Sequence, residues 1–366
     1  MKPLTAIAIS GGIDSLFAGY LLKQAGHDVI GIHFLNGYED PVRPGTHRPE
    51  TTKSGQTDDR MRSQALVERI PLIANQLDIP LEILDLRNEF KETVVTYFTR
   101  AYQAGRTPNP CMVCNPAIKF GSVFNFAKKM GAAYLATGHY ARVSKDPRGQ
   151  SHLLKGVDQA KDQSYFLARL TRAQLAKAIF PLGEMTKKEV KQLAAQKGFF
   201  AVTEQESQDV CFIRGCSYGE FLAREGNVRS RPGPIEDVAG NHLGEHSGLH
   251  LFTIGQRRGI NCPASEPYYV IRIEKKRNCL VVGFKQDLNR SACRVSDINW
   301  IHPPPQSAVP VHTRIRYRSK AVPSTLVPLE ENAARVEFKH VQAAVTPGQA
   351  AVFYRQDEIL GGGWIE

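Results

Sequence analysis

A glycine-containing loop near the amino terminus, Ser10-Gly11-Gly12-Ile13-Asp14-Ser15, constrains the fold more than any other stretch of the chain. Residues 4–9 before it are apolar and β-branched, which is typical of a buried parallel strand. After it, apolar residues recur at helical spacing until Gly26, a residue type common at helix C-termini. The loop therefore predicts a strand-to-helix turn in which backbone N–H groups and the helix N-terminus bind an anion.

This loop does not carry the Gly-Lys-Ser/Thr ending of a Walker loop, so it lacks the groups that assist γ-phosphate transfer. Serines, glycines and one aspartate instead suit a pyrophosphate group, with Asp14 helping to place Mg²⁺. Such a loop favours chemistry in which ATP donates AMP and its two outer phosphates leave together. The alternative is an ordinary glycine turn capped by Ser10 or Asp14. The loop resembles the pyrophosphate loop of the N-type ATP pyrophosphatases, a family of adenylating ligases and thiolases.

Strands and helices alternate through the first part of the chain. Apolar runs predict strands at 28–35, 81–86 and 133–137, and helical spacing predicts helices at 88–103, 120–130 and 186–197. This order predicts an α/β domain with a doubly wound parallel sheet, of the adenine nucleotide α-hydrolase type that the pyrophosphatase resemblance implies. Ligands of such sheets bind beyond the carboxyl ends of the strands, where both the Ser10–Ser15 loop and Gly138 fall.

The composition changes after about residue 212. Residues 226–260 are dense in glycine, proline and histidine, and from Tyr268 onward short strands, Thr313–Arg318 among them, alternate with turns. This pattern predicts a small antiparallel β-barrel at the C-terminal end. We therefore expect a catalytic domain at 1–205, a central domain at 206–280 and a C-terminal β-barrel at 281–366.

Length, charge and cysteine content narrow the class of protein. A chain of 366 residues can form two or three domains, and its formal net charge of +11 favours a polyanionic partner over the alternative of a merely basic protein. No apolar run of membrane-spanning length and no signal-peptide pattern is present, so we expect a cytoplasmic protein without a membrane partner. Seven cysteines without small-scaffold spacing indicate reduced, reactive or metal-binding thiols. The polar loop at 39–57 is typical of a mobile or functional segment.

A Cys-x-x-Cys pair follows two prolines. Pro108 and Pro110 predict an extended, rigid loop that presents Cys111 and Cys114. Such a pair serves as a redox dithiol, as half of a zinc site or as part of an iron–sulfur site, and no second pair completes a zinc site. A third thiol, Cys211, stands where the composition changes. Because apolar residues flank it, the alternative for Cys211 is a buried, inert thiol.

Several longer motifs run in order along the chain: Thr-Pro-Asn-Pro at 107–110, Ala-Thr-Gly-His-Tyr at 136–140, Lys-Asp-Gln-Ser-Tyr-Phe-Leu at 161–167, Val-Cys-Phe-Ile at 210–213, Thr-Ile-Gly-Gln-Arg at 253–257 and Thr-Pro-Gly-Gln at 346–349. Together they resemble the tRNA-specific 2-thiouridylase family across almost the whole chain. Enzymes of this family replace the C2 oxygen of the wobble uridine of certain tRNAs with sulfur. The resemblance implies that the central domain and the barrel contact tRNA.

The resemblance also implies roles for individual residues. ATP would be bordered by Ala8, Ile9, Ser10, Gly11, Gly12, Ile13, Asp14, Ser15, Phe34 and Gly138. The target base would be approached by Asn109, Pro110, Cys111 and His139, and the rest of the tRNA would be contacted by Lys161, Asp162, Gln163, Arg316, Tyr317 and Gln349. Without the resemblance, Arg316 and Tyr317 would be interpreted as a solvated strand face. With it, they suit phosphate contact and base stacking.

The implied chemistry begins with adenylation, which turns the C2 oxygen of uracil into a good leaving group. In the persulfide route, Cys211 accepts sulfur from a donor protein and delivers it to C2 of a base flipped out of the anticodon stack. Cys114 then attacks the Cys211 persulfide and releases sulfide or forms a transient Cys114–Cys211 disulfide. A nearby cation, Lys119 or Arg106, is expected to lower the pKa values of these thiols.

One position departs from the family pattern. Many family members carry aspartate where this chain has Cys111, and the change gives three candidate thiolates: Cys111, Cys114 and Cys211. Three cysteines can ligate a four-iron four-sulfur cluster that leaves one iron open to inorganic sulfide. The persulfide and the iron–sulfur routes both stay open at this point.

Two further functions compete with tRNA thiolation. A small-molecule adenylating ligase of the pyrophosphatase class would explain the Ser10–Ser15 loop, but neither the paired thiols nor a basic barrel. A non-catalytic tRNA-binding protein would explain the charge, but not the thiol motif.

Overall fold

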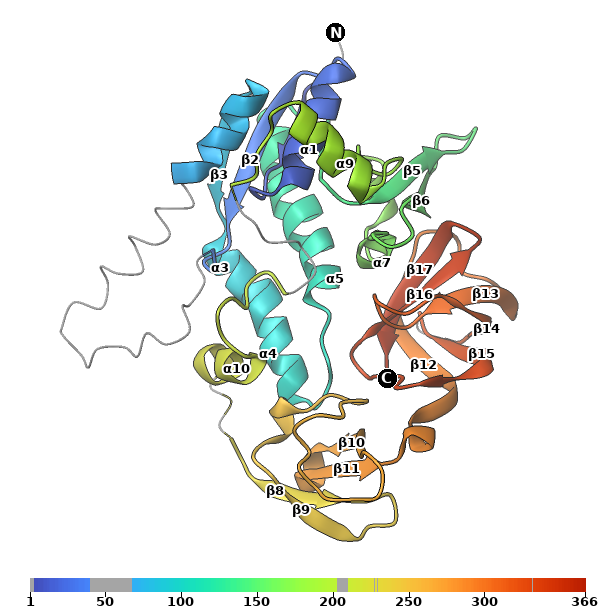
Figure 1. The fold of residues 1–366 in the computed structure, drawn as a ribbon. Helices are drawn as coiled ribbons and strands as arrows, with labels where there is room; N and C mark the ends of the chain where they lie inside the picture. The colour runs from blue at the N-terminus through green and yellow to red at the C-terminus, as the bar shows by residue number, and fades with distance from the viewer. Residues whose placement is uncertain (1–2, 40–67, 203–209, 227, 229, 331) are drawn as a thin grey trace, which may run out of the picture. The chain divides into compact units, whose positions relative to one another are not determined.

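The computed structural model describes residues 3–39, 68–202, 210–226, 228, 230–330 and 332–366 (Figure 1). Apart from Glu39, the polar loop expected at 39–57 therefore lies outside the described residues. The chain divides into two compact units. Unit 1 comprises Met1–Thr93, Val113–Cys216 and Asp357–Ile359, and unit 2 comprises Val94–Met112, Ser217–Gln356 and Leu360–Glu366.

Unit 1 contains a five-stranded parallel sheet with the strand order β3-β2-β1-β4-β7. Its strands are β1 (Thr5–Ala8), β2 (Val29–Leu35), β3 (Leu81–Asp85), β4 (Tyr134–Ala136) and β7 (Ala178–Ile179). The central strand β1 is short, apolar and almost fully buried, and its Ile7 is in register with Gly31 of β2 and Ala136 of β4. The parallel sheet predicted from the alternating pattern is confirmed.

The helices up to residue 196 are α1 (Ile13–Gln24), an unlabelled helix at 68–77, α3 (Arg87–Phe90), η1 (Lys91–Val95), α4 (Thr96–Gln103), α5 (Pro110–Cys114), η2 (Asn115–Val123), α6 (Phe124–Lys129), α7 (Ser164–Leu167), α8 (Arg172–Leu175) and α9 (Lys187–Gln196). Of these, α4 belongs to unit 2, η1 and α5 are each divided between the two units, and the others belong to unit 1. One core cluster joins Ile7 of β1 to Leu16 and Phe17 of α1, Ile73 of the 68–77 helix and Val190 of α9. Burial of these side chains fixes α1 against the sheet and so positions the loop that precedes it.

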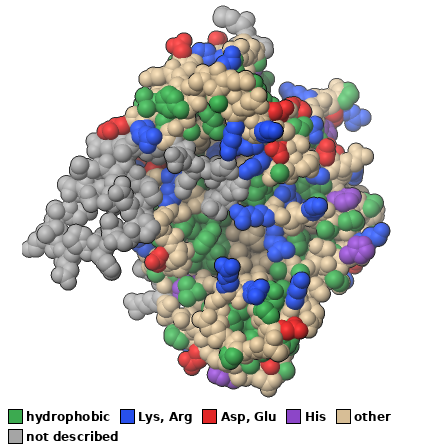
Figure 2. Space-filling model, viewed as in Figure 1, with side chains coloured by type: hydrophobic (Ala, Val, Ile, Leu, Met, Phe, Trp, Pro, Cys, Tyr) green, Lys and Arg blue, Asp and Glu red, His purple; other side chains and the backbone are tan. Residues whose placement is uncertain are grey.

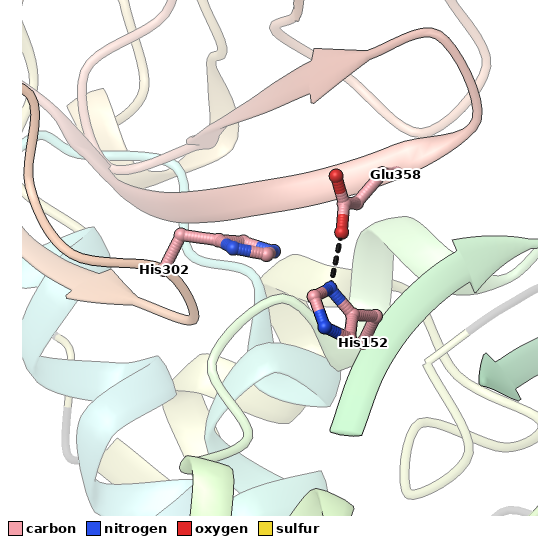
Figure 3. Close-up of side chains that lie close together, drawn as sticks. All are labelled: His152, His302 and Glu358. Carbon is pink, nitrogen blue, oxygen red and sulfur yellow. Dashed lines mark hydrogen bonds and ion pairs between the residues drawn. The ribbon is translucent and has the colours of Figure 1, made fainter. Parts of the chain in front are cut away.

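A two-stranded hairpin of β5 (Ala141–Lys145) and β6 (Ser151–Lys155) completes unit 1. Leu154 of β6 is in register with Glu358, and Nδ1 of His152 shares a hydrogen bond with the Glu358 carboxylate (Figure 3). This contact ties the Asp357–Ile359 segment to the hairpin.

Unit 2 contains α10 (Tyr218–Gly226) and two β structures. The smaller is a four-stranded sheet, in the order β10-β11-β8-β9, of β8 (Gly233–Glu236), β9 (His242–His246), β10 (Tyr269–Glu274) and β11 (Cys279–Gly283), with the short helices η3 (Leu249–Leu251), η4 (Lys275–Arg277) and η5 (Lys285–Leu288) beside it. The larger is a six-stranded antiparallel barrel of β12 (Asn289–Trp300), β13 (Val309–Arg314), β14 (Val322–Pro328), β15 (Ala334–Ala343), β16 (Ala350–Arg355) and β17 (Glu358–Ile365). Pairing of β12 with β17 closes the barrel around Val311, Val336 and Phe353, which confirms the predicted barrel.

One predicted strand is wrong at its end. The alternation in Thr313–Arg318 indicated a strand, but β13 ends at Arg314, and the N–H of Ser319 donates to the carbonyl of Arg316 in a turn. The guanidinium of Arg314 lies 5.2 Å from the Tyr317 ring centroid, and it also donates to the Tyr317 carbonyl. Because the Arg314 side chain donates to the Tyr317 carbonyl, that carbonyl has a hydrogen-bond partner within a turn and does not need one on a neighbouring strand.

In the described parts of the chain, no helix combines the length and the apolar character needed to cross a membrane. Lysine and arginine outnumber aspartate and glutamate by 47 to 36 over the whole sequence, and many of their side chains reach the surface in Figure 2.

Candidate active site

The Ser10–Ser15 loop connects β1 to α1 and is held by the Ser15 hydroxyl. Oγ of Ser15 donates to the carbonyl of Gly12 at 2.9 Å and accepts from the N–H of Ser10 at 3.2 Å. Gly11 has φ +86°, a conformation that favours glycine. Among the described residues no side chain caps the N-terminus of α1, and uncapped N–H groups at a helix N-terminus favour an anion.

Gly138 lies directly on this loop. A Cβ atom at Gly138 would stand 2.8 Å from the carbonyl carbon of Asp14 and 2.9 Å from the backbone nitrogen of Ser15. Only glycine allows the end of β4 to approach the loop so closely. The loop and Gly138 thus form a narrow cradle of backbone at the carboxyl ends of β1 and β4, where the outer phosphates of ATP are predicted to bind.

The Asp14 carboxylate accepts three hydrogen bonds from two residues that the sequence did not single out. Nζ of Lys187 lies 2.7 Å from each carboxylate oxygen, and the Tyr140 hydroxyl donates to Oδ1 at 2.8 Å. Lys187 thus stands beside Asp14, where a Mg²⁺ ion was expected, and the role of Asp14 toward Mg²⁺ stays a prediction. The signal for Lys187 in the sequence was only its place at the start of a predicted helix.

Phe34, another predicted ATP neighbour, is partly exposed near the carboxyl end of β2. The residue before it, His33, is buried, and its Nδ1 lies 2.7 Å from the carbonyl of Ile9. Burial lowers the pKa of His33, and the hydrogen bond to Ile9 and the charge of Glu39 oppose that shift. His33 therefore joins β2 to β1 immediately before the phosphate loop.

Cys111 and Cys114 lie on a helix, which corrects the extended loop expected from the two prolines. Pro110 is the first residue of α5, and proline at that position has no N–H that needs a partner and a φ already suited to the helix. Cys111 is half-buried, whereas only 8% of Cys114 is exposed, so Cys114 is packed against the protein. The helix continues from Cys114 into the π-helical segment η2, a form common at functional sites.

Cys211 is exposed as a residue, whereas the alternative expected a buried one. Phe212 anchors it through ring contacts with Phe90 and Tyr38, at centroid distances of 5.7 and 6.0 Å. Desolvation by the surrounding protein raises the pKa of the Cys211 thiol, while the charges of Lys119 and Arg214 lower it. All seven cysteines are free thiols in this structure.

Lys119 connects Cys211 with the predicted base contact His139. Nζ of Lys119 lies 3.4 Å from Nε2 of His139, and Nδ1 of His139 lies 2.7 Å from the hydroxyl of Thr137. Burial, followed by the charge of Lys119, holds the pKa of His139 well below its usual range, so the ring is neutral near pH 7. Nε2 then accepts from Lys119 and Nδ1–H donates to Thr137. Of the two cations expected near the thiols, Lys119 acts on Cys211, together with Arg214, which was not expected; the effect of Arg106 stays a prediction.

Three predicted tRNA contacts of unit 1, Lys161, Asp162 and Gln163, lie on one loop. Asp162 is buried and accepts from the N–H groups of Gly156 and Ser164, both at 3.1 Å. Oε1 of Gln163 accepts from the N–H of Tyr140 at 3.0 Å. These two side chains therefore stabilise the loop that carries Lys161, next to the residue that contacts Asp14.

In unit 2, the Gln349 side chain contacts the segment before Asn109. Its Nε2 donates to the carbonyls of Thr107 and Pro108 at 3.1 and 3.0 Å, and the N–H of Thr107 donates to the carbonyl of Pro347 at 2.9 Å. The N–H of Asn109 also lies 3.3 Å from the Tyr97 hydroxyl. The Thr-Pro-Gly-Gln motif thus holds the Thr-Pro-Asn-Pro motif.

Three family models match the chain. They are described as a tRNA methyl transferase HUP domain over residues 4–215, a tRNA methyl transferase PRC-barrel domain over residues 219–284 and an aminomethyltransferase beta-barrel domain over residues 290–365.

Curated relatives match over nearly their whole length. The chain is 50% identical over 364 residues to the tRNA-specific 2-thiouridylase MnmA of Desulfosudis oleivorans, with 100% of this chain and 95% of the relative covered. It is 42% identical over 360 residues to the tRNA-specific 2-thiouridylase MnmA of Geotalea uraniireducens, with 98% and 94% covered. It is 41% identical over 365 residues to the protein of the same name from Moorella thermoacetica, with 98% of each covered.

Proposed function

The chain belongs to the tRNA-specific 2-thiouridylase family, and on that premise we propose that it is a cytoplasmic ATP-dependent sulfurtransferase that converts the wobble uridine of tRNA to 2-thiouridine. The proposal rests on one observation: unit 1 contains the phosphate cradle together with Cys114, Cys211 and the pair Lys119–His139. A small-molecule ligase needs the cradle but has no use for two cysteines of such different exposure.

The first step is adenylation of the base. The C2 oxygen of uracil attacks the α-phosphorus of ATP, the bond from that phosphorus to the bridging oxygen breaks, and N3 of the base loses its proton to water. Pyrophosphate leaves with the electron pair. The Ser10–Ser15 loop and the uncapped N-terminus of α1 supply N–H donors for the charge on the leaving pyrophosphate.

The second step transfers sulfur. The terminal sulfur of a Cys211 persulfide, loaded by a donor protein, attacks C2, and AMP leaves with its oxygen. The Cys114 thiolate then attacks Sγ of Cys211, the sulfur–sulfur bond to the base breaks, and a Cys114–Cys211 disulfide forms, which a thiol reductant reopens. The exposure of Cys211 suits loading by a large donor, and the burial of Cys114 suits a thiol that reacts only inside the site.

The runner-up mechanism uses the same scaffold. Cysteine thiolates suit iron, and a four-iron cluster held by Cys111, Cys114 and Cys211 would supply an open iron for inorganic sulfide. In either mechanism His139 is a neutral ring near the base whose Nε2 accepts from Lys119, and Lys119 favours the thiolate form of Cys211.

The experiment is a reconstitution. Full-length protein, ATP, tRNA and either a persulfide donor or sulfide are incubated, and the digested tRNA is analysed by mass spectrometry for replacement of one oxygen by one sulfur at the wobble uridine. We expect that product together with AMP and pyrophosphate. Formation of AMP and pyrophosphate with a free amino acid or nucleotide, but not with tRNA, would assign the chain to the small-molecule ligases, and tRNA binding without any turnover would make it a binding protein.

A further inference from the structure

Lys187 is the one cation in direct contact with the phosphate loop among the described residues. It stands 173 residues after Asp14 in the chain, and its Nζ is 2.7 Å from both oxygens of that carboxylate. Only 12% of its side chain is exposed, and its ammonium lies 6.0 Å from the centroid of the Tyr140 ring. A lysine so enclosed is not a solvated surface charge.

The backbone of Lys187 is fixed by its neighbours. Thr186 and Glu189 form a capping box at the start of α9, in which Oγ1 of Thr186 accepts from the N–H of Glu189. The N–H of Lys187 donates to Oδ2 of Asp158 at 2.9 Å. Because these first N–H groups of α9 already have protein partners, the helix end is not itself an anion site. The part of α9 that contacts the phosphate loop is therefore the side chain of Lys187.

The Lys187 side chain changes the net charge of the phosphate loop. Asp14 is the one acidic residue of Ser10–Ser15, and alone it would repel the outer phosphates of ATP. Lys187 neutralises it. An ammonium group has three hydrogens, and the two oxygens of Asp14 engage two of them, so one remains for a further acceptor.

We propose that Lys187 is a phosphate-binding residue of this site, which takes the place of the lysine that a Walker loop carries in its own sequence. The inference rests on the proposed function and names a new residue for it. Lys187 contacts the β- and γ-phosphates of ATP while Asp14 keeps its ammonium beside the N-terminus of α1. As the α-phosphorus bonds to the uracil oxygen and pyrophosphate leaves with the electron pair, Lys187 stabilises the added negative charge.

The test compares three ligands by calorimetry on the full-length protein: ATP, inorganic pyrophosphate and AMP, each with Mg²⁺. The variants are Lys187→Met, Lys187→Gln, which keeps a hydrogen-bond donor for Asp14 without the charge, and Lys187→Arg. Lys188→Met, in the next and exposed residue of α9, is the matched control. We expect Lys187→Met and Lys187→Gln to bind ATP and pyrophosphate about ten- to a hundredfold more weakly and AMP within about twofold of wild type. Lys187→Arg should restore part of the loss, and Lys188→Met should bind like wild type.

Two results would overturn the inference while the proposed function stands: ATP and pyrophosphate bound normally by Lys187→Gln, or AMP weakened as much as ATP, which would indicate damage to the fold. Should wild-type protein bind neither ATP nor pyrophosphate, the proposed function fails, and the role of Lys187 fails with it.

Discussion

Nζ of Lys119 lies 3.4 Å from Nε2 of His139, and the same ammonium lowers the pKa of the Cys211 thiol. One cation thus acts on the predicted base contact and on the predicted sulfur carrier. Both effects have the expected sign, because a positive charge favours a thiolate and disfavours an imidazolium.

Replacing Lys119 with methionine should therefore reduce the reactivity of Cys211. Although the residue is exposed, the surrounding protein desolvates its thiol and already raises the pKa, so without Lys119 the pKa rises further and the thiolate fraction at pH 8 falls. We expect alkylation of Cys211 by iodoacetamide, followed by peptide mass spectrometry, to slow severalfold and its pH profile to move upward. Lys128→Met, at an exposed position of α6, is the control. An unchanged pH profile in Lys119→Met would contradict the role of this charge.

Cys114 and Cys211, both in unit 1, should fail in different ways when each is replaced by serine. In the persulfide route, Cys114→Ser stops the reaction after sulfur has reached C2, because no thiolate then breaks the bond to Cys211. We expect tRNA joined to Cys114→Ser protein by a bond that dithiothreitol cleaves, seen on a denaturing gel, and none with Cys211→Ser. Cys293→Ala, in the barrel, should turn over like wild type. Full thiolation by Cys114→Ser with either sulfur source would remove this cysteine from the mechanism.

Gly138→Ala should damage the cradle without unfolding the protein. The new Cβ would meet backbone atoms of Asp14 and Ser15 at 2.8 and 2.9 Å, and backbone cannot move aside as a flexible side chain can. We expect the KM for ATP to rise at least about tenfold, with the thermal unfolding temperature changed by only a few degrees. Gly131→Asn is a suitable control, because its left-handed backbone suits asparagine and nothing lies within 4 Å of its Cβ position. A normal KM for ATP in Gly138→Ala would mean that nucleotide does not bind against this loop.

The strand-to-helix turn at Ser10–Ser15 could be predicted from the sequence because its signal is local. A buried strand, a glycine turn and an amphipathic helix are each encoded in a few consecutive residues, and β1 and α1 match the expected ranges within about three residues. The barrel was predicted for the same reason, since alternation along each strand is a local pattern.

Contacts between distant residues carried no such signal. Lys187 and Tyr140 meet Asp14 only in the fold. Tyr140 ends the Ala-Thr-Gly-His-Tyr motif, but nothing in that motif indicates a contact with Asp14, and no motif includes Lys187. The two prolines before Cys111 predicted an extended chain, whereas Pro110 begins a helix. Proline is common both in extended segments and at the first position of a helix, so its presence does not distinguish the two. The strand expected through Arg316 failed because Arg314 captures the Tyr317 carbonyl, a contact that alternation does not reveal.

Gln349 is a further case in which a residue expected to contact tRNA also has a structural partner. Gln349→Leu removes both hydrogen bonds to Thr107 and Pro108, which should lower the free energy of unfolding by about 1–2 kcal/mol in urea titration. Amide exchange at Thr107, whose N–H donates to Pro347, should become faster. Gln342→Leu loses only local contacts to His340 and Val341 and should change neither quantity. If Gln349→Leu unfolds like wild type and loses only tRNA affinity, the residue serves the RNA and not the loop.

The choice between the two sulfur routes follows from the iron content of the protein. Three free cysteines, one of them at the position of a family aspartate, suit iron, whereas an exposed Cys211 and a buried Cys114 suit persulfide transfer. If the persulfide route operates, protein purified without oxygen should contain no stoichiometric iron or acid-labile sulfide, and treatment with a chelator should change neither its visible absorbance nor its thiolation rate with a persulfide donor. Cys111→Ser should then keep most of its activity, because Cys111 holds no metal in this route. About four iron atoms per chain with a broad absorbance band in the blue-violet, both lost in Cys111→Ser, would instead establish the iron–sulfur route on the same scaffold.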